Sequence, residues 1–223
     1  MLLNDLQRLF PLASATTWHQ HANGRGWVQN TAKVDGAAYI GIDCVVVGNA
    51  HVFGNARVSG DVRVCDYAQV FGNAHLYGNA QLFGYAQVYG NAHVYGNAHV
   101  LGSSRVFDDA HLSGDAQVTG NAYLYGNAHL SGNARMECYA VVYGNIWNFS
   151  PLQIIGTKHF VNVCAHGLLR IGCEDHPIEW WKENYLAFGR MAGYTAAQIE
   201  EYRNYIELTH IWMKIHNCEK GAA

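Results

Sequence analysis

An aliphatic residue recurs every six positions along the middle of the chain, from Val46 to Val142, without an insertion. Most blocks continue with a polar or aromatic residue, a Gly-Asn or Gly-Asp pair and a small residue, as in Val88–His93, which reads Val-Tyr-Gly-Asn-Ala-His. Self-similarity at a short fixed period indicates a solenoid. Gly and Asn tolerate positive φ, so these pairs can turn the chain. The pattern therefore predicts very short strands that alternate with tight corners.

These blocks resemble the hexapeptide-repeat, left-handed parallel β-helix family, in which three hexads form one triangular coil. In that family the aliphatic and the small residue of each hexad point inward. The resemblance implies a mostly β fold, a triangular solenoid, for residues 46–142. Upstream, Val28, Val34 and Ile40 keep the six-residue phase. We therefore expect the β-helix to begin near Trp27.

The composition changes toward Trp, Glu and Lys after Val142. We expect three parts: an N-terminal cap over residues 1–26, the β-helix over 27–147, and a small C-terminal α/β cap over 148–223. A solenoid needs caps because its terminal coils present unpaired backbone groups that would favour end-to-end stacking. In the N-terminal part, Trp18 to His21 is predicted to form a capping strand.

Three short strands are predicted at the start of the C-terminal cap, over residues 152–155, 159–164 and 168–172. Two helices are predicted to follow. Pro177 occupies the opening position of the first, and Gly189 is expected to end it.

The second helix is predicted to open with the capping box that begins at Thr195 and closes with Gln198. The apolar faces of the two helices carry Trp181 and Trp212, which we expect at an interface with the open end of the rod or with a neighbouring subunit.

Residues eighteen apart should stack at the strand spacing of about 4.8 Å. One outward column then carries an aromatic ring in every coil. Stacked rings stabilise a sheet by themselves, by roughly 0.2–1 kcal/mol per pair. A contiguous apolar stripe also marks a subunit or partner interface, and we expect this one to be buried in a homo-oligomer, either a dimer or a trimer. The column comprises Phe53, Phe71, Tyr89, Phe107, Tyr125 and Tyr143.

A second outward column carries histidines. Imidazole is a common metal ligand and titrates near neutrality, which makes these residues candidate metal ligands and makes His93 and His111 candidate general bases. A flat column offers one nitrogen per coil along a line, whereas a zinc site needs three or four converging ligands. The alternative is that histidine was copied with the repeat. We predict no metal site. The column comprises His75, His93, His111 and His129.

The hexapeptide family includes zinc-dependent carbonic anhydrases and many acyltransferases. This likeness implies one function, a coenzyme-A-dependent acyltransferase with a histidine of this column as general base, which would bind coenzyme A or acetyl-CoA. Known acyltransferases typically carry a projecting loop. The chain has no insertion between Val46 and Val142, which weakens the acyltransferase assignment.

The repeats, which carry no insertion, look closer to uncharacterised bacterial and phage hexapeptide-repeat proteins than to the acyltransferases. Those proteins have a repetitive rod and a short mixed cap. That resemblance implies a non-catalytic, oligomeric protein-binding or scaffold module without a cofactor, encoded by a phage or prophage and acting on a host protein. We favour this second function.

One local cluster in the cap contains side chains that could take part in a reaction, the segment from Gly172 through Cys173 to Pro177. Cys173 precedes a predicted helix start, where the helix dipole can lower a thiol pKa, and His176 lies three residues on. The carboxylates of Glu174 and Asp175, which lie between them, would instead raise the thiol pKa. Cys173 is thus a candidate nucleophile, and a strand end plus helix cap is the alternative.

The net charge is −3 and charged residues make up 14% of the chain, without a basic run, so we expect no nucleic-acid partner. Six cysteines without C-x-x-C spacing are typical of free thiols in a reducing compartment. Neither a signal peptide nor a membrane-spanning stretch is predicted. We expect a cytoplasmic protein, in the host cytoplasm if phage-encoded.

Overall fold

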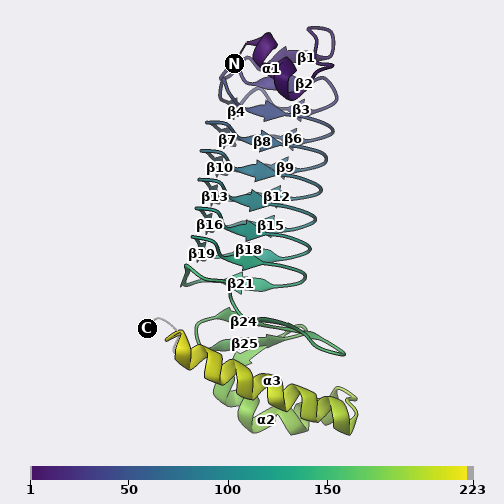
Figure 1. Cartoon of the computed structure of the whole chain (residues 1–223), viewed down its shortest axis with the longest axis vertical. Helices are drawn as coiled ribbons and strands as arrows, with labels where there is room; N and C mark the ends of the chain where they lie inside the picture. Colours follow the sequence, from purple (N-terminus) through teal and green to yellow (C-terminus); the bar gives the residue numbers. More distant parts are fainter. Residues whose placement is uncertain (1, 220–223) are drawn as a thin grey trace.

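The computed structural model describes residues 2–219 as a rod that carries a helical element at each end (Figure 1). Strands along the rod pair in parallel with strands eighteen residues away, so that His75 pairs with His93 and Leu76 with Val94. The strands form three sheets that run the length of the rod. The expected parallel β-solenoid with a two-helix C-terminal cap is therefore confirmed.

The first sheet has eight strands, of which only the pair β1–β2 is antiparallel. Its strands are β1 (Trp18–Gln20), β2 (Trp27–Gln29), β5 (Val45–Val46), β8 (Arg63–Val64), β11 (Gln81–Leu82), β14 (His99–Val100), β17 (Gln117–Val118) and β20 (Arg135–Met136).

The second sheet has seven strands and carries the aromatic column. Its strands are β3 (Lys33–Val34), β6 (His51–Val52), β9 (Gln69–Val70), β12 (Gln87–Val88), β15 (Arg105–Val106), β18 (Tyr123–Tyr125) and β21 (Val141–Tyr143).

The third sheet also has seven strands and carries the histidine column. Its strands are β4 (Tyr39–Ile40), β7 (Arg57–Val58), β10 (His75–Leu76), β13 (His93–Val94), β16 (His111–Leu112), β19 (His129–Leu130) and β22 (Ile146–Trp147).

The interior of the rod is made by the aliphatic and small residues of the repeat. Val88 and Ala92, like their counterparts along the rod, are 0% exposed. Ser104 replaces the usual alanine and is also fully buried. Its Oγ donates to a backbone carbonyl oxygen, with Leu101 O at 2.8 Å and Val118 O at 3.0 Å. A polar residue is tolerated in this core because its hydroxyl has hydrogen-bond partners.

Corner residues hold successive coils together. The Asn73 amide donates to Asn91 Oδ1 at 3.2 Å, and the Asn91 amide donates to Asp109 Oδ1 at 2.9 Å. The residue before each such corner residue adopts positive φ and is usually a glycine, for example Gly60 with φ +80°, although Asp108 takes this place before Asp109 with φ +58°. At Gly60 a Cβ would lie 2.5 Å from the carbonyl oxygen of Gly78 on the next coil.

Gly60→Ala is expected to lower the free energy of unfolding by about 1–3 kcal/mol, because it combines a left-handed backbone with a clash against backbone. Gly36→Ala is the matched control, since nothing lies within 4 Å of a Cβ built at Gly36. Denaturant unfolding of both variants measures the difference. Equal midpoints for the two variants would show that the corner relaxes without cost.

The C-terminal cap is an antiparallel sheet followed by two helices, and it lies below the last coil in Figure 1. The sheet contains the three predicted strands and a fourth, β26, which was not predicted because its sequence lacks the alternation of apolar and polar residues. The elements are β23 (Gln153–Ile155), β24 (Phe160–Ala165), β25 (Leu168–Ile171), β26 (Glu174–Pro177), α2 (Ile178–Met191) and α3 (Ala196–Ile215).

Helix α2 passes through Gly189, so the prediction that Gly189 ends it is wrong. Gly189 is buried, and a Cβ there would lie 2.9 Å from Ile199 Cγ1 of α3. The glycine therefore allows the two helices to approach closely, and the turn is made by Gly193, which has φ +68°. The capping box from Thr195 to Gln198 is confirmed at the start of α3.

The cap closes the rod with side-chain amides. Asn162 Nδ2 donates to Val141 O at 2.8 Å, and Asn162 Oδ1 accepts from Val141 N at 3.4 Å. Gln153 Oε1 accepts from Glu137 N at 2.7 Å, and Gln153 Nε2 donates to Arg135 O at 2.9 Å. Each amide supplies a donor and an acceptor, as the next strand of a sheet would.

At the other end, helix α1 (Leu3–Leu9) and the predicted capping strand, β1, cover the first coil. Leu6, Trp18, Trp27 and Val45 form a small buried cluster beneath them. In the part of the chain that the structure describes, no helix is long and apolar enough to cross a bilayer.

Candidate functional site

The aromatic column of the second sheet is a near-parallel stack from Phe53 to Tyr125, and the ring of Tyr143 continues it with a tilt of 36°. The Phe71 and Tyr89 centroids are 4.7 Å apart with the ring planes 2° from parallel, and the Tyr89 and Phe107 centroids are 4.9 Å apart at 6°. All six rings are half-buried, because each ring covers the faces of its neighbours. At the cap end the Tyr143 hydroxyl donates to Asp175 Oδ2 at 3.2 Å. The column therefore presents ring edges, with its last member tied to the cap.

The histidine column of the third sheet is stacked from His93 to His129, and the ring of His75 is tilted by 46° against that of His93. Ring centroids are 4.9 Å apart for His75 and His93, 4.8 Å for His93 and His111, and 4.3 Å for His111 and His129. Stacked rings place their nitrogens along a line rather than around a point. Across residues 2–219, no three histidine, cysteine or acidic side chains gather as a metal-binding group.

Burial is the main cause of the pKa shifts of two members of this column, His75 and His111. Burial lowers the pKa of His75, followed by the positive charges of His93 and Arg57. Burial likewise lowers the pKa of His111, followed by the charge of His129. The folded chain thus binds fewer protons than the unfolded chain below the ordinary histidine pKa of about 6.5. Stability is full above that pH and falls as the pH drops through the lowered pKa values.

The thermal midpoint should accordingly be lower at pH 5.5 than at pH 7.5. The double variant His75→Gln/His111→Gln should flatten this dependence, and Gln87 holds the equivalent position of the second sheet, so glutamine fits the coil. A part of the dependence should remain, because burial also lowers the pKa of His166 in the cap. An unchanged pH slope in the double variant would exclude the column as its source.

Cys173 does not stand at a helix start. Strand β26 separates it from α2, so the expectation that a helix dipole acts on its thiol is wrong. The side chain is exposed and lies 3.7 Å from Glu174 Oε1. His176 stacks on Trp180 with centroids 3.7 Å apart. Cys173 lies in the turn of the hairpin between β25 and β26, where Ile171 pairs with Glu174, so the alternative of a strand end plus helix cap describes only the strand end.

Trp181 belongs to the chain's own core, so the expectation that it meets a neighbouring subunit is wrong, whereas the alternative of packing within the chain is not contradicted. It is 1% exposed, and its Nε1 donates to Leu169 O at 2.7 Å. Trp212 is half-buried against Phe149, with ring centroids 5.7 Å apart, and stacks on His216 at 4.3 Å. Both tryptophans join α2 and α3 to the rest of the cap, and Trp181 offers no surface to a partner.

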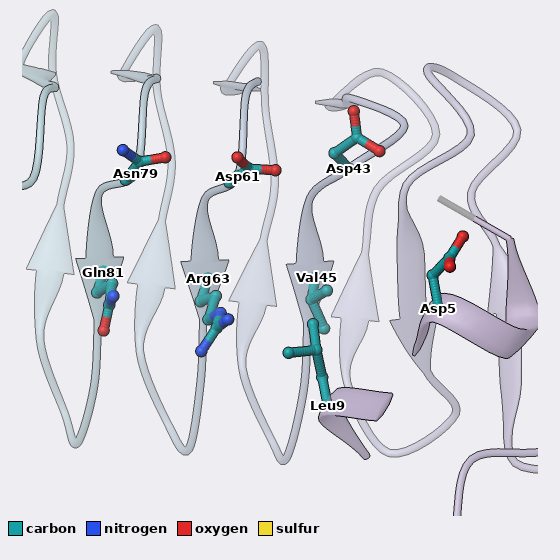
Figure 2. A pocket seen from close by; sticks show the side chains of 8 residues that line it. All are labelled: Asp5, Leu9, Asp43, Val45, Asp61, Arg63, Asn79 and Gln81. Atoms are coloured by element: carbon teal, nitrogen blue, oxygen red, sulfur yellow. The ribbon is translucent and has the colours of Figure 1, made fainter. Parts of the chain in front are cut away.

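The structure adds a polar hollow that the sequence analysis did not single out. Figure 2 shows Asp43 and Asp61 on successive coils of the rod, with Arg63 on the strand that follows Asp61. Asp5 and Leu9 of α1 form its other wall. The hollow has a volume of about 460 Å³. The six-residue period could have revealed the aspartate pair, but α1 joins it only through the tertiary structure.

Comparison with known proteins agrees with this geometry. A family model described as the YdcK β-solenoid repeat matches residues 86–102, a segment slightly shorter than one coil, which includes β12, β13 and β14. The chain carries a β-solenoid repeat. No curated protein matches the chain. The matched repeat describes the rod alone and assigns no chemistry to the columns on its surface.

Proposed function

We propose that the protein is a non-catalytic rod that self-associates along its aromatic column and serves as a binding or scaffold module for another protein. The observation that carries this proposal is the unbroken row of rings from Phe53 to Tyr143, stacked as far as Tyr125, which presents ring edges along the second sheet. Extended apolar stripes of this kind are typical of interfaces.

The histidine column supports the same proposal. General-base catalysis needs one positioned histidine with an orienting partner. His93 and His111 stack on equivalent neighbours, and within residues 2–219 neither imidazole is hydrogen-bonded to a carboxylate. Nothing in this arrangement distinguishes one histidine from the next.

Native mass spectrometry of the purified protein tests the proposal, with Phe71→Ser/Tyr89→Ser as the variant. Serine fits this position of a coil, as Ser113 shows in the third sheet. Tyr77→Ser/Tyr95→Ser is the matched control, because it removes a ring stack of 4.8 Å spacing from the third sheet. We expect a dimer or trimer for the native chain and the control, and a monomer for the variant.

The same measurement with coenzyme A and acetyl-CoA tests the acyltransferase alternative. An oligomer that binds neither ligand supports the proposal of an interaction module. Stoichiometric uptake of coenzyme A would replace the proposal with the acyltransferase and direct mutagenesis to the histidine column.

More specifically, we propose that the chain is encoded by a phage or prophage and binds a host protein in the cytoplasm. The free state of all six cysteines fits such a reducing compartment. Affinity purification from host cells, with the Phe71→Ser/Tyr89→Ser variant as the comparison, tests this form.

A further inference from the structure

One corner column of the rod departs from the repeat. It lies two residues before the second sheet and contains the positions that stack at eighteen-residue spacing from Thr31 to Tyr139. Asn49 follows the repeat, but tyrosine replaces asparagine at Tyr67 and Tyr85. The two rings stack with centroids 5.0 Å apart and planes 11° from parallel, and they are 49% and 61% exposed.

The stack ends abruptly at Tyr67. Tyr85 covers one face of the Tyr67 ring, so its other face is directed toward the preceding coil, where the shorter Asn49 occupies the same position. A hollow of about 320 Å³ lies here. It is lined by Thr31, Lys33, Asn49, His51, Gln69 and the two tyrosines.

Three of the polar side chains that line this hollow are not used by the fold. Within residues 2–219, the Lys33 ammonium and the side-chain amides of Asn49 and Gln69 make no hydrogen bond or ion pair. By contrast, the corner amide of Asn73 is paired with that of Asn91. An open aromatic face thus lies beside three side chains that can donate to a ligand.

The geometry points to a sugar-binding site, with a pyranose ring of a glycan packed against the free face of Tyr67. The C–H groups of a pyranose carry partial positive charge and match the negative face of an aromatic ring. Lys33, Asn49 and Gln69 would donate to its hydroxyl oxygens, as the few polar groups of a ligand site do. A nucleobase could also stack here, but the chain has a net charge of −3 and only one cation lines the hollow, which disfavours a polyanion.

Saturation-transfer NMR with the full chain tests the assignment, using cellohexaose, maltohexaose, chitohexaose and adenosine as separate probes. We expect transfer to the pyranose protons of at least one oligosaccharide. Absence of transfer to all three, or transfer to adenosine alone, would overturn the assignment.

Two variants locate the site. Tyr67→Ala should weaken binding of the oligosaccharide at least tenfold, whereas Tyr139→Ala, a tyrosine of the same corner column that is 64% exposed, should leave it within twofold. Asn49→Tyr should also abolish binding, because it extends the stack and covers the free face without removing a ring. Equal binding by native protein and Tyr67→Ala would overturn the assignment, as would unaltered binding by Asn49→Tyr.

Discussion

Replacing Trp147 with alanine is expected to lower the free energy of unfolding by about 3–5 kcal/mol. Trp147 is 0% exposed and is the last inward residue of the third sheet. Its ring contacts Phe149 at a centroid distance of 5.8 Å and His166 at 5.0 Å, and its Nε1 donates to Gly144 O at 3.1 Å. The substitution would leave a cavity between the rod and the cap.

Denaturant unfolding measures this loss, and Ile146→Ala is the control. Ile146 is the neighbouring residue of the same strand but is 68% exposed. Its truncation should change the free energy of unfolding by no more than about 0.5 kcal/mol. Similar losses in both variants would show that the end of the rod is not packed as a core.

Asn162→Leu is expected to lower the free energy of unfolding by about 2–6 kcal/mol, since each of two buried backbone groups left without a partner costs roughly 1–3 kcal/mol. Asn162 is 1% exposed, and its amide pairs with both the N–H and the C=O of Val141. Leucine has a similar volume but can neither donate nor accept. The variant also weakens the cap over an open sheet edge, so we expect it to form end-to-end assemblies.

Unfolding curves and size-exclusion chromatography with light scattering test both effects. Asn204→Leu is the control, because Asn204 is exposed on α3. It should remain as stable and as uniform in size as the native chain. If the Asn162→Leu protein is as stable and as uniform in size as the native chain, the rod tolerates unpaired backbone groups at this coil.

The surfaces of the rod could be predicted because their geometry follows from the period. Positions eighteen apart stack, so His93 was expected beside His111 and Phe71 beside Tyr89, and both pairs lie less than 5 Å apart. The degree of burial could not be predicted in this way. Rings that were expected to form an exposed stripe cover one another and are only half-exposed.

The cap was harder to predict because its elements depend on contacts between distant residues. Strand β26 is polar and pairs with β25, as Arg170 with Asp175. Without that partner its sequence looks like a loop before a helix, and Cys173 was consequently placed at a helix start. Trp181 lies on the apolar face of an amphipathic helix, and such a pattern does not reveal whether the face meets its own sheet or another subunit.

The repeat by itself determined the parallel solenoid, its inward residues and the columns on its flanks. It could do so because Gly at the corners and an aliphatic residue every sixth position restrict each coil locally, and eighteen-residue stacking then follows. Only the tertiary structure decided how the ends are closed and where hollows form. Those features depend on which distant side chains meet: Asn162 pairs with the last coil, and the Tyr67 ring face is open because Asn49 is short.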